Sequence, residues 1–159
     1  MNDLEPTKNK LLKLFKYKDG DLFNNFDRSS RALQGHVVGS KHSGGYLRLS
    51  IDYKSHQAHR LVWIMHNGSI PDGLFIDHIN GIRNDNRIEN LRLVTRQENG
   101  FNDHKAKGYS WSKSENKWES YIKINYKKIN LGKFDTESDA RQAYLNAKEK
   151  FHKIEVRHA

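Results

Sequence analysis

Residues 76–99 constrain the fold most, because they place a strongly polar segment between two short apolar runs. The stretch opens with Ile-Asp-His-Ile-Asn-Gly and ends with Asn-Leu-Arg-Leu-Val-Thr-Arg-Gln-Glu-Asn. Residues 84–87, Asn-Asp-Asn-Arg, are too polar for a core. We therefore predict a short strand over residues 74–77, a loop, and a second strand over residues 91–94.

A helix is predicted directly after the second strand. Thr95-Arg-Gln-Glu98 matches a capping box, in which the Thr hydroxyl and the Glu carboxylate satisfy free amides of the first helical turn. Thr95 is then the N-cap, and Asn99 lies at the end of the first turn. This order of elements allows Asn99 to face the strand end that carries Asp77 and His78.

The composition favours two small domains or one ordinary domain, with a polyanionic partner. Of the 159 residues, 35% are hydrophobic and 30% are charged, so the core must be modest or split in two. The net charge of +9 favours nucleic acid, although a basic protein without such a partner has the same composition. The lack of cysteine excludes disulfides and thiolate zinc sites.

No membrane segment is expected. Crossing a bilayer takes about 20 consecutive apolar residues, and no run approaches that length. The first six residues lack the basic and apolar regions of a signal peptide. The cytoplasm is therefore the expected location, and the absence of cysteine agrees with it.

The N-terminal part should form a mixture of short helices and strands. Residues 7–15 have helical periodicity, and residues 46–53 alternate as a half-buried strand. Arg48 on the open face of that strand is either solvated or a phosphate contact. Residues 58–67 form a helix that ends at Gly68.

Two histidines share one face of the helix over residues 58–67. His59, Trp63 and His66 are spaced at i, i+4 and i+7. Paired histidines can bind a metal, but no third ligand lies nearby in the sequence and Trp63 favours packing. The His59-Arg60 pair remains a candidate neighbour of the active site.

The chain restarts as a small module after a polar, basic linker over residues 103–107. Three alternating stretches, residues 109–111, 117–124 and 128–131, predict strands. Thr136 begins a second capping motif and a helix. The predicted core side chains are Tyr109, Trp111, Trp118, Ile122, Ile124, Ile129 and Leu131. Overall we predict an α+β fold with domains over residues 1–102 (core 74–102) and 108–159.

The polar groups of residues 76–99 suit phosphodiester cleavage. A neutral imidazole such as His78 can accept a proton from water, and a hard divalent ion takes oxygen ligands such as Asp77 and Asn99. Asn90 can hold the other nitrogen of the imidazole. Each residue alone has an ordinary explanation, as an incidental pair, a turn residue or a surface residue, so the prediction depends on the combination.

The combination resembles the HNH endonuclease motif of phage and intron-encoded homing endonucleases, in the variant with Asn as the last residue. The resemblance lies in residues 76–81, 85–91 and Asn99, and in the preceding Ala-His-Arg-Leu-Val-Trp of residues 58–63. It implies a ββα-metal fold that binds one divalent ion, with Mg²⁺ expected and Mn²⁺ the alternative. It also implies that His78 is the general base, Asn90 its orienting residue, and Asp77 and Asn99 the metal ligands. The implied products carry 5′-phosphate and 3′-hydroxyl ends.

The C-terminal module resembles the AP2 DNA-binding domain of plant transcription factors and phage endonucleases. The resemblance is carried by Gly-Tyr-Ser-Trp of residues 108–111, Lys117-Trp118, residues 131–136 and residues 140–144. It implies that the three-stranded sheet lies in the major groove of double-stranded DNA. The residues that alternation then turns toward DNA are Ser110, Ser112, Glu119, Tyr121, Lys123, Lys128 and Asn130. A solvated basic sheet face is the competing interpretation for each.

The leading hypothesis is a site-specific, metal-dependent DNA endonuclease, encoded by a phage or mobile element and acting in the host cytoplasm. A DNA-binding regulator that has lost catalysis is the alternative, and the joint presence of the four site residues argues against it. An RNA-binding accessory protein is a weaker third hypothesis. One active site per chain fits a nicking monomer or a homodimer that cuts both strands.

Overall fold

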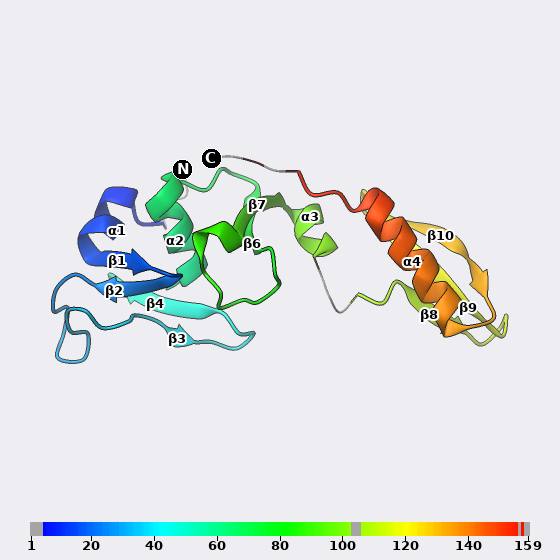
Figure 1. Ribbon diagram of the computed structural model, residues 1–159, viewed down its shortest axis with the longest axis horizontal. Helices are drawn as coiled ribbons and strands as arrows, with labels where there is room; N and C mark the ends of the chain where they lie inside the picture. Colours follow the sequence, from blue (N-terminus) through cyan, green and yellow to red (C-terminus); the bar gives the residue numbers. More distant parts are fainter. Residues whose placement is uncertain (1–4, 103–105, 156, 158–159) are drawn as a thin grey trace. The chain divides into compact units, whose positions relative to one another are not determined.

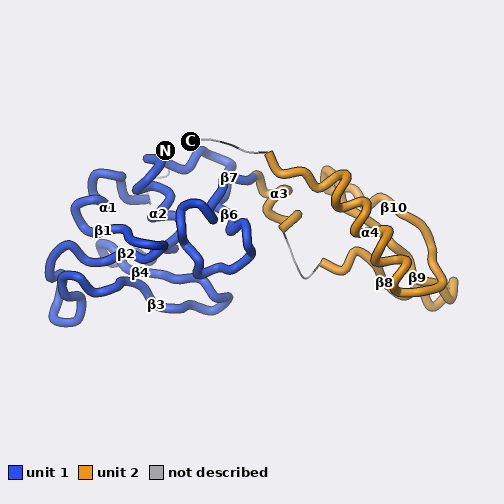
Figure 2. The backbone as a smooth tube through the Cα atoms, viewed as in Figure 1, with its two compact units in different colours: residues 1–94, 156–159 blue, residues 95–155 orange. Residues whose placement is uncertain are grey.

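The computed structural model describes residues 5–102, 106–155 and 157, which divide into two compact units. The first unit is Met1–Val94 with Val156–Ala159, and the second is Thr95–Glu155 (Figure 2). Residues 103–105 of the predicted linker lie outside the described residues.

The boundary between the units precedes the one predicted at Asn102, because the helix after Thr95 groups with the C-terminal module. The Phe101 ring stacks on the His152 ring, with centroids 3.9 Å apart and planes 10° apart. The Glu98 carboxylate accepts the backbone N–H of Glu155 at 3.1 Å. The segment after the last helix therefore packs on the helix that carries Asn99.

The first unit begins with a helix and a hairpin (Figure 1). These are α1 (Lys8–Leu14), β1 (Phe15–Lys18) and β2 (Asp21–Asn24), with β1 and β2 antiparallel. The prediction placed Phe15 in the helix, whereas it begins β1 and is buried. Gly20 in the turn has φ +95°, and a Cβ there would lie 2.9 Å from the Arg87 nitrogen, so both the conformation and the close approach require glycine.

A three-stranded antiparallel sheet and one helix contribute to the core of the first unit, together with residues of α1, β1 and β2 and of the strands over residues 74–78 and 91–95. The sheet order is β3 (Ser40–Lys41), β4 (Leu47–Ile51), β5 (Lys54–Gln57), and α2 (Ala58–Asn67) follows directly. Leu49 and Ile51 of β4 are buried, as the alternation predicts. β5 was not predicted, because Lys54 and Ser55 look like a turn and pairing with β4 alone makes them a strand.

The polar stretch forms the predicted strand, loop, strand and helix. β6 (Leu74–His78) pairs with β7 (Leu91–Thr95), and the loop between them ends in a 3-10 turn, η1 (Ile88–Asn90). α3 (Arg96–Phe101) follows, with both bonds of the predicted capping box. The Thr95 hydroxyl accepts the Glu98 N–H at 3.3 Å, and the Glu98 carboxylate accepts the Thr95 N–H at 2.8 Å.

The second unit adds a three-stranded antiparallel sheet with a helix over one face. The order is β10 (Lys127–Phe134), β9 (Lys117–Ile124), β8 (Tyr109–Ser112), and α4 (Glu137–Phe151) packs on the sheet (Figure 1). Ile122 is buried against Tyr144 and Ala147 of α4. The predicted cap holds, since the Thr136 hydroxyl accepts the Asp139 N–H at 3.1 Å.

Two predicted core residues of this sheet are exposed. Trp111 and Ile129 are each 43% exposed. They lie on the edge strands β8 and β10, whereas Ile122 on the central strand lies fully under the helix. A single helix buries the middle of a three-stranded sheet better than its edges.

Among the helices that the structure describes, none is both long and apolar enough to cross a bilayer.

Candidate active site

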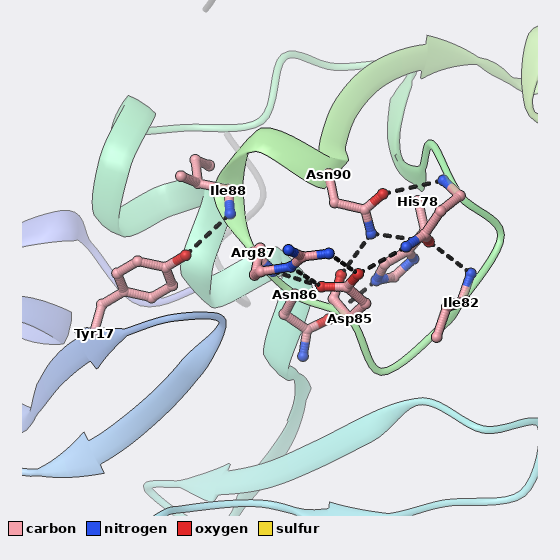
Figure 3. Close-up of polar contacts among 9 residues, drawn as sticks. Tyr17, His78, Ile82, Asp85, Asn86, Arg87, Ile88 and Asn90 are labelled. Atoms are coloured by element: carbon pink, nitrogen blue, oxygen red, sulfur yellow. Dashed lines mark hydrogen bonds and ion pairs between the residues drawn. The ribbon is translucent and has the colours of Figure 1, made fainter.

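His78 ends β6 as a buried imidazole whose Nε2 atom contacts an amide. It is 4% exposed, and its Nε2 atom lies 3.0 Å from the amide oxygen of Asn86 (Figure 3). An amide oxygen only accepts, so this contact places the proton on Nε2. The neutral ring then has its lone pair on Nδ1, the nitrogen that can take a proton.

Asn86 is a site residue that sequence reasoning missed. The Asn-Asp-Asn run was explained as ordinary loop structure, yet Asn86 is 1% exposed and contacts His78. Its Nδ2 atom is buried without a hydrogen-bond partner among the described residues. Nothing in the sequence distinguishes this Asn from its exposed neighbour Asn84.

Asn90 holds the loop between the two strands. Its amide nitrogen donates to the Asn80 side-chain oxygen at 3.0 Å and to the Asp85 backbone carbonyl at 2.8 Å. Its amide oxygen accepts the Asn80 backbone N–H at 3.0 Å (Figure 3). The described partner of Nε2 of His78 is thus Asn86, where the sequence suggested Asn90. Asn90 fixes the loop that carries Asn86 and so contributes to the site indirectly.

The rest of the loop is braced by an ion pair. Arg87 makes a two-pronged contact with Asp85, at 2.8 and 2.7 Å, and the Asn80 side chain donates to the same carboxylate at 2.7 Å. The hydrogen bonds from Arg87 hold the pKa of Asp85 well below its usual range. The Asp85 carboxylate therefore braces the loop.

Asp77 is buried beside His78 and is held by Arg92. The Nε and Nη2 atoms of Arg92 both donate to Oδ2 of Asp77, at 2.9 and 2.7 Å. Arg92 was not singled out from the sequence, although it alternates with buried Leu91 and Leu93 on the strand that pairs with β6. That alternation, combined with strand pairing, would have pointed to it.

His59 of α2 lies against His78, as the sequence left open. Their ring centroids are 5.0 Å apart, and the Tyr46 ring is 5.3 Å from that of His59. Burial lowers the pKa of His59 to about 3, and the charges of His78 and Arg60 act in the same direction. Its Nδ1 atom is buried without a described hydrogen-bond partner. A neutral ring here gives His78 an uncharged neighbour near pH 7.

Arg83 adds positive charge near the histidines. Its guanidinium lies 5.1 Å from the Tyr46 ring centroid, and Nη1 donates to the Gly44 carbonyl at 2.8 Å. The Tyr46 ring centroid is in turn 6.1 Å from that of His78.

The oxygen donors that were predicted to bind metal lie in different units. Asp77 is in the first unit, and Asn99 lies exposed on α3 in the second. Over residues 5–102, 106–155 and 157, no three His, Asp or Glu side chains form a metal-binding cluster. The donor set still fits Mg²⁺, which proteins commonly hold through one or two side-chain oxygens together with water and substrate phosphate. Both bonds from Arg92 end on the same oxygen of Asp77, which orients the carboxylate.

The predicted DNA-facing residues share one side of the second unit's sheet. Strand register pairs Lys123 with Lys128 and Tyr121 with Asn130, and the Lys128 ammonium lies 4.0 Å from the Tyr121 ring centroid. Ser110 pairs with Glu119, and Ser112 with Lys117. Cross-strand partners project from the same face, so the set lies opposite Ile122 and α4.

Comparison with known proteins gives a family match that runs from the end of β5 through α3. The family model described as HNH endonuclease matches residues 56–101. Protein 3.8 of Escherichia phage T7 is 36% identical over 86 residues, covering 50% of this chain and 71% of that protein. The gene 5.3 protein of Enterobacteria phage T3 is 33% identical over 77 residues, covering 45% of this chain and 76% of that protein.

Two further similarities involve proteins named as HNH endonucleases. HNH endonuclease L560 of Acanthamoeba polyphaga mimivirus is 32% identical over 107 residues, covering 65% of this chain and 57% of that protein. The second is a solved structure of DNA binding and cleavage by the HNH homing endonuclease I-HmuI. The match covers 73% of this chain and 70% of the I-HmuI chain, with 22% sequence identity and a TM-score of 0.45.

Proposed function

Because residues 56–101 form an HNH endonuclease domain, which makes the protein a DNA-cleaving enzyme, we propose that it is a metal-dependent, site-specific endonuclease of the homing type. The observation that carries the proposal is the buried His78 beside Asp77, with Nε2 held by Asn86. An imidazole held in one orientation next to a carboxylate suits metal-assisted phosphodiester hydrolysis.

His78 is the general base of the proposed reaction. Nδ1 takes a proton from a water molecule as the water oxygen attacks phosphorus. The bond from phosphorus to the 3′-oxygen breaks, the 3′-oxygen gains a proton, and the products carry 5′-phosphate and 3′-hydroxyl ends. Asn86 positions the base, because its amide oxygen keeps the other ring proton on Nε2.

Asp77 and Asn99 would hold the divalent ion, with Mg²⁺ the expected ion and Mn²⁺ the alternative. When bound, the ion would supply positive charge that stabilises the leaving 3′-oxygen. Arg92 prepares the site by holding Asp77 through Oδ2. The proposed site is of the ββα-metal type, and its elements in sequence order would be β6, β7 and α3.

The second unit reads DNA through its open sheet face. Lys123 and Lys128 contact phosphates, while the shorter polar side chains, Ser110, Ser112 and Asn130, reach base edges with Glu119 and Tyr121. The AP2-like arrangement, with a sheet in the major groove, gives this face its orientation. Acting as a monomer, the protein nicks one strand, and as a homodimer it cuts both.

Plasmid cleavage with and without Mg²⁺ tests the metal-dependent reaction. Wild type should cut only with a divalent ion. The cleavage rate of Asp77→Asn should be lower by about 100-fold or more, because the charge of the metal ligand is lost. Asp72→Asn, at an exposed turn, is the matched control and should cut normally. Ligase should reseal the nicks, which requires 5′-phosphate ends. Cutting in excess chelator, or unaltered cutting by Asp77→Asn, would disprove the metal site.

The same assay separates the enzyme from a catalytically inactive regulator. Tight, sequence-specific binding without cutting in Mg²⁺, Mn²⁺ or any other divalent ion would support the regulator.

A further inference from the structure

A polar groove of about 770 Å³ lies in the first unit, apart from the residues that surround His78. Its floor is β4, through Leu49 and Ser50, and its walls come from the loop before β3. That loop is held in place, since the Arg28 guanidinium donates to the Ser50 carbonyl at 2.9 Å and Val37 bridges to Phe23 of β2.

The groove is lined by positive charge that is not neutralised internally. Arg28, Arg31 and Arg48 line it, and neither Arg31 nor Arg48 pairs with a carboxylate among the described residues. Asp52 is the single carboxylate of the lining, and it forms an ion pair with Lys10. Guanidinium groups match phosphate oxygens in two-pronged contacts, so the groove suits a phosphate-bearing ligand.

A strained aromatic residue stands at the mouth of the groove. Asp52 and Tyr53 form the tip of the β4–β5 hairpin with φ of 49° and 63°, and Tyr53 is fully exposed. Hairpin tips with two positive φ values favour Asn-Gly, because a side chain at the second position is strained. A bulky aromatic residue kept at such a position is a pointer to contact with a ligand.

We propose that this groove is a second DNA-binding site of the protein, in which Arg28, Arg31 and Arg48 bind the phosphate backbone of duplex DNA and Tyr53 packs against the same duplex. The choice of DNA as the ligand rests on the proposed function, and the positive charge of the groove supports that choice. In this proposal the groove is a DNA contact in addition to the residues around His78 and to the sheet of the second unit.

Salt-dependent binding tests the arginines, in the His78→Ala protein with chelator so that no DNA is cut. Removing two phosphate contacts with Arg31→Ala and Arg48→Ala should lower the slope of log affinity against log salt by about 1.8. Lys13→Ala with Lys18→Ala removes equal charge outside the groove and should leave the slope unchanged. Equal slopes for both pairs would overturn the proposal. Arg31→Glu, an exposed loop change compared with Lys13→Glu, repeats the test without altering β4.

Tyr53 offers a readout in which stability and binding change in opposite directions. Tyr53→Gly relieves the positive φ, so the melting temperature should stay equal or rise, while DNA affinity should fall about fivefold or more through loss of the aromatic contact. Tyr53→Phe should bind within about twofold of wild type, since it retains the ring. Wild-type affinity of Tyr53→Gly would remove Tyr53 from the site.

Directed cleavage locates the DNA itself. The chain has no cysteine, so Ser40→Cys in the groove can carry a single iron chelate that cuts nearby DNA. Discrete cuts from Ser40→Cys, and none from Lys18→Cys, would support the proposal, and the reverse would refute it. This result does not depend on His78, so a failure of the proposed cleavage chemistry and a failure of the groove remain distinguishable.

Discussion

At the scale of single residues, His78 depends on groups that are far from it in the sequence or look ordinary there. Asn86 accepts from Nε2, and His59 lies edge-on to the ring. The pair Asp77-His78 was identified from the sequence because the motif is local. Asn86 was not predicted as a site residue, because the sequence does not show which of several loop amides the fold buries.

Asn86→Ala should lower the cleavage rate by about 10–100-fold while DNA affinity stays near wild type. Without the amide oxygen, the tautomer and the orientation of His78 are no longer fixed. Removing a residue that holds an active-site group typically lowers activity by about this factor. Single-turnover kinetics at saturating DNA measures it. Asn84→Ala, an exposed change in the same loop, is the matched control and should cut normally. A normal rate for Asn86→Ala would remove the residue from the site.

His59 should make folding stability depend on pH. Its folded pKa of about 3 lies below the ordinary 6.5, so between these values the unfolded chain binds a proton that the folded chain does not. Stability from this residue is complete above pH 6.5 and falls as the pH drops toward 3, with a slope approaching about 1.4 kcal/mol per pH unit.

Urea unfolding at several pH values between 4 and 8 measures this slope. His59→Phe should flatten the curve over the window, whereas His36→Gln, at an exposed site, should follow wild type. Parallel curves for His59→Phe and wild type would show that His59 is not held neutral by the fold.

At the scale of elements, periodicity and capping signals predicted most of the structure. Helix α2 spans the predicted residues, and both Thr95 and Thr136 are N-caps with the expected bonds. Strand β5 escaped prediction because polar Lys54 and Ser55 become a strand only by pairing with β4. The exposure of Trp111 likewise follows from its position on an edge strand. Local alternation of residues does not predict which strands lie at the edge of a sheet.

The open face of the second unit's sheet should bind phosphates through its paired lysines. Lys123→Ala with Lys128→Ala should weaken DNA binding and lower the salt slope by about 1.8, because two phosphate contacts are lost. Lys127→Ala with Lys150→Ala removes the same charge from the start of β10 and from α4 and should have little effect. Equal losses from both pairs would move the DNA-binding face elsewhere.

At the scale of the whole molecule, the compact units meet at residues 94 and 95, whereas the sequence suggested a domain boundary after residue 102. The polar run after Phe101 suggested a boundary at Asn102. The stacking of Phe101 on His152 and the bond from Glu155 to Glu98 place α3 in the second unit. These contacts join residues about fifty positions apart, which no local pattern reveals. The helix that carries Asn99 thus belongs to the same unit as the predicted DNA-reading sheet.

The central claim is that His78 is the base that activates water. The most direct test is the single-turnover cleavage rate of His78→Ala at saturating DNA and Mg²⁺, beside its DNA affinity. Loss of a general base should slow cleavage by about 10²–10⁴-fold, with affinity within a few-fold of wild type. A rate within tenfold of wild type would contradict the claim.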